Sequence, residues 1–477
     1  MIYGQASSGA ARRLAALGLV AVGVLLSGCS TYADRNAALR DDLIARDYDA
    51  ALKVVDEAER GSDRLLNLLE RGLVLHYADR WAESNDVFAE AEALSDDLYT
   101  KSVSQAVLSL VTNDGAIDYR AAPFEMALVP YFRALNYIYL GDRDEAIVEA
   151  RKAELRLRDL ADVDRAMRDE EEGDDDPAVS LEDHAFVHYL RGMLHEWGGE
   201  SNDAFLAYRR AALAFAAGED QLHIATPPWL GEDLLRTGTI LGFHDELLEI
   251  QQALPNLLPS QLADPGGLGR VVIFLESGFA PQRVSAAADV PIFKGEREDD
   301  VDAWALGLRG RYVHGWRNDV EIDTWIRFAL PELSDQPPAV AGARISSGTP
   351  YGHVSTVDVE DVSGRSHLYF ESSMGKILLK TIARAVAKYV AKEKVEEQGR
   401  VAGLLANLLG VATEQADTRN WLTLPRSIAM ARLDLPPGIH DLKVELVDDR
   451  GRVLAVESLP GVVVRQGDWT FLSRRVF

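Results

Sequence analysis

The spacing of apolar residues divides the chain into two parts of different character. Between residues 36 and 255, apolar positions recur every three or four residues, which is the period of amphipathic helices. Beyond residue 269 the apolar runs become short and continuous or alternating, which is typical of β-strands. A proline- and glycine-rich stretch, residues 256–269, separates the two patterns and predicts a linker. We therefore predict an α+β multidomain protein, with a helical domain at 36–255 and a β-rich domain at 270–477.

Four stretches of the helical part align without gaps. They are DYDAALKVVDEA (47–58), RWAESNDVFAEA (80–91), DRDEAIVEARKA (142–153) and ESNDAFLAYRRA (200–211). Each has a small residue at its fifth position, and the last three have another small residue twelve positions earlier. The two sets of small residues are Ala51, Ser84, Ala146 and Ala204, and Gly72, Ala134 and Gly192.

This pattern resembles the tetratricopeptide repeat, in which small residues at these positions let two helices pack closely. The first two copies are 33 residues apart, while the later offsets of 62 and 58 residues leave room for an extra helix or loop. Stacked repeats form a curved solenoid with a concave binding surface. The resemblance implies a TPR-like solenoid that either binds a protein partner or serves only as a structural platform.

The β-rich part begins with the sequence RVVIFLESGFAPQRVS and ends in a series of short strands. The turn signals Pro436–Gly438 and Asp449–Gly451 join those strands into hairpins. Residues 366–415 interrupt the strands with a helical pattern. We expect an antiparallel, sandwich-like domain that carries residues 366–415 as an inserted helical hairpin.

The N-terminus reads as an export signal. Arg12 and Arg13 precede an uncharged stretch, Leu14–Leu26, which is too short to span a bilayer. The next residues, LSGC, resemble the lipobox of bacterial lipoproteins, and Cys29 is the only cysteine in the chain. The resemblance implies cleavage after residue 28, acylation of Cys29 and a tether at residues 29–35. An ordinary signal peptide with an unmodified cysteine is the alternative.

Four further segments extend the resemblance to a family of uncharacterised bacterial lipoproteins with tetratricopeptide-like N-terminal repeats. They are VVIFLESGFAPQRV, FALPEL, KTIARAVAKYV and ADTRNWLTLPRSIAMARLDLPPGIHDL. Genes of that family often lie near relatives of the curli-secretion pore lipoprotein or of the lipoprotein activator of peptidoglycan synthase. Because Ser30 rather than Asp follows the cysteine, the resemblance implies the outer membrane, facing the periplasm, as the location.

Almost all of the net charge of −26 falls on residues 29–264, whereas the rest of the chain is nearly balanced. Such an acidic surface repels nucleic acid, so we expect no nucleic-acid partner. The densest acidic run, residues 168–178, lacks the spacing of a calcium loop and predicts a disordered loop.

Three histidines, His184, His188 and His195, are spaced for one face of a helix, as metal ligands would be. Because Gly192 fixes the helix register, we place them in the core and predict no metal and no cofactor. The chain also lacks the motifs of serine hydrolases, phosphate loops and zinc peptidases. We therefore expect no enzyme and no catalytic residues, although an unrecognised carboxylate pair stays open.

Residues 376–398 carry a cation every four positions: Lys376, Lys380, Arg384, Lys388 and Lys392. An apolar stripe runs beside them, and residues 401–411 have no charge. The simpler interpretation is a helical hairpin packed on the β-domain with solvated cations. The alternative is a basic stripe that contacts a phospholipid surface or an acidic protein surface.

The function that we predict is a lipid-anchored, periplasm-facing scaffold that binds another envelope protein in outer-membrane or cell-wall assembly. Two alternatives belong to other classes. One is a periplasmic hydrolase of glycan or peptidoglycan with an unrecognised carboxylate site. The other is an accessory of an export machinery that acts on the membrane through residues 376–411.

Overall fold

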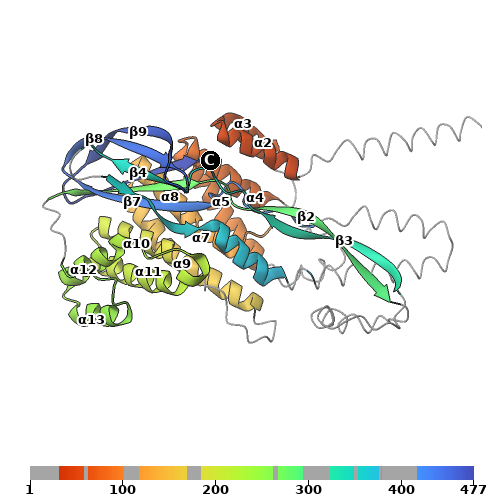
Figure 1. Cartoon of the computed structure of the whole chain (residues 1–477), viewed down its shortest axis with the longest axis horizontal. Coiled ribbons are helices and arrows are strands. Elements are labelled where there is room, and N and C mark those ends of the chain that lie inside the picture. The colour runs from red at the N-terminus through yellow and green to blue at the C-terminus, as the bar shows by residue number, and fades with distance from the viewer. Residues whose placement is uncertain are drawn as a thin grey trace, which may run out of the picture.

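The computed structural model describes residues 32–57, 63–100, 118–168, 184–261, 267–293, 322–348, 353–374, 378 and 416–477. Helices form the first part of the chain and strands the second (Figure 1). The helices are α2 (Tyr32–Ile44), α3 (Tyr48–Glu57), α4 (Arg64–Tyr77), α5 (Trp81–Thr100), α7 (Pro123–Ala127), α8 (Val129–Leu140), α9 (Arg143–Arg168), α10 (Ala185–Trp197), α11 (Ser201–Leu222), α12 (Pro228–Leu241) and α13 (His244–Ala253). Residues 362–374 are also helical.

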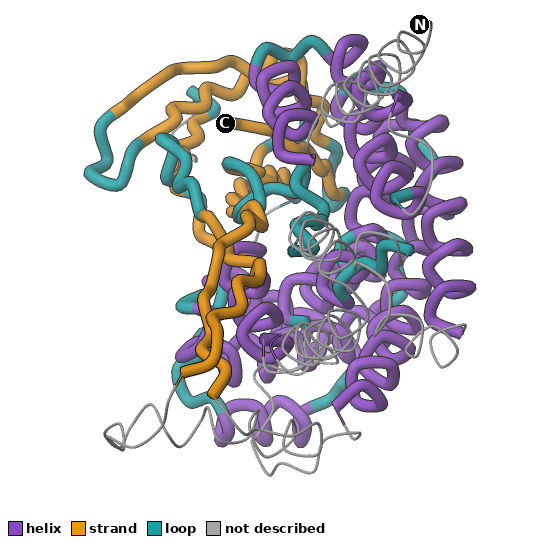
Figure 2. The backbone as a smooth tube through the Cα atoms, turned by 90° about the vertical axis from the view of Figure 1, so that its right-hand side faces the viewer, coloured by secondary structure: helices purple, strands orange, loops and turns teal. Residues whose placement is uncertain are grey.

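The helices follow one another as packed pairs, α2/α3, α4/α5, α8/α9, α10/α11 and α12/α13. Tight turns join them: Gly141 ends α8 and Gly242 ends α12, both with positive φ (77° and 74°), a conformation that glycine adopts without strain. Each pair packs on the next, so the helices make one curved layer beside the strands (Figure 2).

The strands form two four-stranded sheets and one two-stranded ribbon. Sheet A has the order β10-β1-β7-β6, sheet C has the order β5-β4-β8-β9, and β2 pairs with β3 in the ribbon. The strands are β1 (Gly269–Ser277), β2 (Gln282–Phe293), β3 (Ile322–Ser334), β4 (Gly342–Ser346), β5 (His353–Ser355), β6 (Val357–Asp361), β7 (Ser427–Leu435), β8 (Gly438–Val447), β9 (Val453–Val464) and β10 (Trp469–Val476).

The prediction of a purely antiparallel β-domain is wrong for sheet A. Strand β10 runs parallel to β1, with Arg270 opposite Trp469 and Ser277 opposite Val476. The chain enters β10 from β9 of the other sheet, and such a crossover between sheets lets the strand lie parallel to its partner. The other pairings between described strands are antiparallel, including the predicted hairpin β8/β9. The hairpin predicted across Pro436–Gly438 is wrong, because β7 and β8 belong to different sheets and do not pair.

The molecule has three layers: helices, sheet A and sheet C. Alternate residues of β1 show why, because side chains of a strand alternate between its faces. Val271, Ile273 and Leu275 join an aliphatic core with residues of β4, β8 and β9. Val272 and Phe274 join a second core with aromatic residues of the helices. Sheet A is therefore buried on both faces.

Helices give way to strands where the sequence predicts, since α13 ends at Ala253 and β1 begins at Gly269. The two parts do not have separate cores, however. One hydrophobic cluster includes Phe88 and Phe132 of the helices together with Trp421 and Met430 of the β-rich part. The helical layer and sheet A are thus packed as one unit.

Several predicted segments lie outside the described residues: the signal 1–28, most of the acidic loop and most of the helical insertion. Helix α2 already begins at Tyr32, within the predicted tether 29–35, and α9 continues to Arg168, the first residue of the predicted loop. In the part of the chain that the structure describes, no helix is long and apolar enough to cross a membrane.

Candidate functional site

The small residues of the predicted repeats lie where paired helices touch. An added β-carbon at Gly72 of α4 would come within 2.6 Å of the Phe88 ring of α5. At Gly192 of α10 it would overlap the Tyr208 ring of α11. The Ser84 hydroxyl also donates a hydrogen bond to the Gly72 carbonyl (2.7 Å). Larger residues would push these helices apart.

The remaining small residues of the pattern, Ala51, Ala134, Ala146 and Ala204, are buried as well. Each lies on the side of its helix that packs against other helices or the sheet, where side-chain volume limits the approach. The structure therefore places all seven small residues inside the helical layer.

The inner face of the helical layer is covered by sheet A. Residues Val129–Asn136 of α8 and Ala185–His195 of α10 are buried without interruption, so these stretches of the two helices are enclosed on all sides. The Tyr131 ring lies edge-on to Phe274 of β1, with centroids 5.5 Å apart. The surface on which a curved repeat array would bind a ligand is occupied by the chain's own strands.

A buried carboxylate, Glu276 of β1, is one of the polar contacts across this interface. It accepts hydrogen bonds from the hydroxyls of Tyr77 (2.7 Å) and Tyr131 (2.6 Å). Burial and the neighbouring carboxylate raise the pKa of Tyr77 well above its usual value, so the phenol keeps the proton that it donates. Arg475 lies over the Tyr77 ring (5.5 Å) and donates to the Glu276 carbonyl (3.2 Å).

A second buried carboxylate, Asp233 of α12, lies further along the same interface. Arg432 of β7 (2.8 Å) and Arg236 (2.6 Å) both donate to it, and so does the Tyr189 hydroxyl (3.0 Å). Burial by itself would raise the pKa of Asp233, but the two guanidinium groups outweigh it and hold that pKa below its usual value. Arg236 also pairs with Glu196 of α10, so the cluster joins two helices to the sheet.

A segment without regular secondary structure, residues 416–424, enters the core and carries the buried Trp421. The Trp421 amide donates to the carboxylate of Glu125 (2.9 Å), which also accepts hydrogen bonds from the Tyr119 hydroxyl (2.7 Å) and the Ala122 amide (2.7 Å). Burial raises the pKa of Glu125. The sequence alone assigned this segment no role; the available signal was a tryptophan that follows the polar residues Thr418–Asn420.

The three histidines of α10 and its N-cap are all buried, as predicted, and each has different surroundings. His188 Nδ1 lies 3.0 Å from a nitrogen of Arg191, and His195 Nδ1 lies 2.7 Å from Glu200. Polar atoms of His195, Glu200 and Asp203 lie within 4.8 Å of one another, and Arg151 pairs with Glu200. The histidines do not converge on one point.

The outer surface of the helical layer exposes large apolar side chains. Four leucines on three of the outer helices are 46–60% exposed: Leu155 of α9, Leu206 and Leu213 of α11, and Leu248 of α13. Ion pairs link these helices, Arg210 with Glu154 and Arg209 with Glu249. These leucines carry no signal in the sequence, because a single exposed leucine is common on protein surfaces.

A polar groove of about 320 Å³ opens between α3 and α4. Its charged lining residues are Asp49, Lys53, Asp56, Arg71 and Arg80. Asp56 pairs with Arg71 (3.6 Å), so at least one of the two carboxylates is balanced by a cation.

Two predicted sites lie outside the described residues. They are the lipidation site Cys29 and the basic stripe Lys376, Lys380, Arg384, Lys388 and Lys392. Both stay predictions from the sequence.

Comparison with known proteins adds little. No family model matches the chain, and no curated protein matches it. Among solved structures, the TPR2AB-domain:pHSP90-complex of yeast Sti1 is similar at 13% identity, over 46% of this chain and 95% of that one. The TM-score is 0.20, so this likeness supports no conclusion about fold or function. The structure itself shows a mixed helix-and-sheet protein, in which a helical N-terminal region packs on separate sheets of the C-terminal part.

Proposed function

We propose that this protein is a protein-interaction scaffold of the cell envelope, anchored by a lipid on Cys29. The observation that carries the proposal is the set of exposed leucines on the outer helices, Leu155, Leu206, Leu213 and Leu248. Large apolar side chains that are exposed on a surface are candidate sites of protein association.

The docking surface is the outer rather than the inner face of the helices. Sheet A covers the inner face with aromatic packing and buried ion pairs, and uncovering it would expose the core. The outer face offers leucines flanked by the charged pairs Arg210–Glu154 and Arg209–Glu249. An apolar centre with a charged rim is the usual composition of a protein-binding surface.

The lipid anchor supplies the location. The basic residues, short apolar stretch and LSGC sequence support export and acylation at Cys29. Several acyl chains on one residue give stable membrane attachment. A scaffold attached in this way, facing the periplasm, would hold its partner at the outer membrane during envelope or cell-wall assembly.

The test is a pull-down from detergent-solubilised envelopes with the full-length chain as bait. Replacing Leu206 and Leu213 by arginine should abolish recovery of a stoichiometric partner, because two charges would have to be desolvated on binding. The matched control is Val456→Arg, an equally exposed apolar residue on β9. Partner recovery that survives L206R/L213R but is lost in V456R would overturn the assignment of the outer face.

A second measurement separates the scaffold from the enzymatic alternative. The purified protein is incubated with intact peptidoglycan, and soluble glycan fragments are measured. A scaffold releases none, whereas release that persists in L206R/L213R would mean that the protein acts as a hydrolase.

A further inference from the structure

His184 lies where α10, strand β6 and helix 362–374 meet. It precedes the first residue of α10 and is fully buried. Neither ring nitrogen makes a hydrogen bond of normal geometry. Oε2 of Glu360 in β6 also lacks a partner and lies 3.5 Å from His184 Nδ1. Buried polar groups are rarely left in this state.

The charges at this contact balance only while the imidazole is neutral. Arg365 of helix 362–374 donates from Nε to Glu360 Oε1, so one cation faces one carboxylate. Glu360 is fully buried and Arg365 almost so. A proton on His184 would leave two cations against one carboxylate in a closed site, which is strongly unfavourable.

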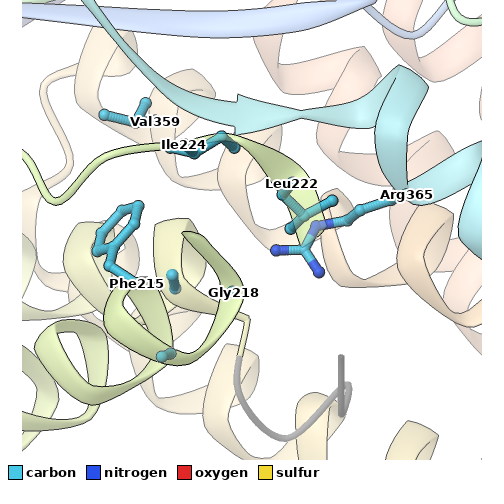
Figure 3. A pocket seen from close by; sticks show the side chains of 8 residues that line it. Phe215, Gly218, Leu222, Ile224, Val359 and Arg365 are labelled. Atoms are coloured by element: carbon cyan, nitrogen blue, oxygen red, sulfur yellow. The ribbon is translucent and has the colours of Figure 1, made fainter. Parts of the chain in front are cut away.

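The space beside the contact leaves little room for water. The cavity beside the contact is lined by Ala185, Val359, Arg365 and apolar residues of α11 and the loop that follows it (Figure 3). Its volume is about 10 Å³, which is room for a single water molecule at most. The side chain of Arg365 reaches into this space (Figure 3).

Strand β6 is suited to leave the sheet locally. It has five residues, lies at the edge of sheet A and, among the described strands, pairs with β7 alone. Its register shifts between Asp358 and Glu360, which shortens the ladder further. Elements of this kind open with much less free energy than the core does.

We propose that the contact of β6 and helix 362–374 with α10 is a pH-sensitive switch that protonation of His184 opens. At neutral pH the imidazole is uncharged and the contact is closed. In acid, the cost of the buried charge separates β6 and helix 362–374 from α10, while the rest of sheet A keeps its pairing. The switch does not depend on the proposed docking face.

The sign of the pH dependence follows from the neighbours of His184. Burial, and then Arg365 and His188, lower the pKa of His184 well below its usual value of about 6.5. The closed contact therefore has its full stability above pH 6.5 and loses it as the pH falls below that value, since the open form takes up the proton first.

Two carboxyl groups of β6 act in the opposite direction. Burial raises the pKa of Glu360 and of Asp358, and Asp361 raises that of Asp358 further. The folded state binds protons at these groups more readily than the unfolded state, so they add stability as the pH falls. Without His184, this contact should therefore gain stability rather than lose it as the pH falls.

The test is hydrogen–deuterium exchange of the full-length chain at pH 7.5 and 5.5, corrected for the intrinsic exchange rates. We expect the protection of peptides within 184–190 and 357–374 to fall about fivefold to tenfold from pH 7.5 to pH 5.5. This is the range that protonation of one histidine allows, because pH 5.5 lies about one unit below the usual histidine pKa. Residues 271–275 of β1 should keep their protection. Equal protection of residues 357–374 at both pH values overturns the proposal.

The variant His184→Leu sharpens the test. It removes the titrating ring and should leave residues 357–374 equally or better protected at pH 5.5. The matched control is His244→Leu, an exposed histidine at the start of α13, which should respond as the wild type does. A wild-type response in H184L refutes the role of His184; should that variant not fold, the wild-type measurement alone decides.

Discussion

The two faces of sheet A are built from the same strands but are packed in different ways. Toward sheet C, the buried residues of the core are all valine, leucine, isoleucine or alanine. Toward the helices, the sheet presents aromatic rings together with buried charges, among them Phe274, Glu276 and Arg432. One strand, β1, contributes Ile273 to the first face and Phe274 to the second.

The two faces of sheet A supply different properties to the fold. Aliphatic packing is favourable in many relative positions of two sheets, because dispersion and apolar burial have little direction. Hydrogen bonds from Tyr77 and Tyr131 to one carboxylate require one position of the helices. We infer that the aliphatic face supplies cohesion and the polar face fixes where the helical layer sits.

The largest expected effect comes from breaking the ion cluster. Arg432→Met should lower the free energy of unfolding by about 3–5 kcal/mol, because Asp233 stays buried with one guanidinium fewer. Urea unfolding at pH 7 measures it. The double variant Asp233→Leu/Arg432→Met should regain most of the loss, since it removes the stranded charge. A double variant as unstable as the single one would contradict a positional role for the cluster.

The aliphatic face should lose stability by a different mechanism. Ile273→Ala leaves a cavity between the sheets and should lower the free energy of unfolding by about 2–5 kcal/mol. The measurement is again urea unfolding. The control is Lys443→Ala on the exposed side of β8, whose free energy of unfolding should stay within about 0.5 kcal/mol of the wild type. A loss as small as that of the control would mean that the sheets are not held by this core.

The polar face can be tested at a single hydrogen bond. Tyr77→Phe removes one of the two donors to Glu276 and should cost about 1.5–3 kcal/mol, since it leaves a buried carboxyl oxygen without its donor. Tyr139→Phe is the control, because the Tyr139 hydroxyl bonds the hydroxyl of Ser473 (2.9 Å) and its loss should cost about 0.5–1.5 kcal/mol. Equal losses from the two variants would argue against a larger contribution of the Glu276 contact.

The smallest effect is expected within the helical layer, away from both faces. Gly192→Ala should lower the free energy of unfolding by about 1–3 kcal/mol, because the new methyl group overlaps the Tyr208 ring. Gly218→Ala in α11 meets nothing closer than Leu222 at 3.9 Å and should instead stabilise by about 0.4–1 kcal/mol. In thermal unfolding, the melting temperatures of the two variants should shift in opposite directions. Shifts of the same sign would show that the helices at Gly192 can accommodate a methyl group.

Local patterns were enough to predict the elements. Small residues twelve positions apart marked the contacts of α4 with α5 and of α10 with α11, because helix geometry makes that spacing a packing constraint. The turn at 449–451 marked the hairpin of β8 and β9. These features depend on residues close together in the chain.

The arrangement of the layers could not be predicted in this way. Pairing of β1 with β10 and the cover over the inner helix face depend on residues that are far apart in the sequence. One signal was available, however. Glu276 and Arg432 are charged residues within largely apolar strands, and a charge in such a place indicates a buried partner. The partner itself, Asp233 or a tyrosine pair, had no local signature.

The parallel pairing of β1 with β10 has a consequence for how the protein is made. The helices and β1 are synthesised first, but β1 obtains one of its two neighbours only when residues 469–476 have been added. Until then Tyr131 and Phe274 lack part of their cover, and the nascent chain presents apolar surface on which it can aggregate. Long-range pairing of this kind also slows folding. A chaperone that shields the helices until synthesis reaches residue 476 would therefore raise the yield of folded protein.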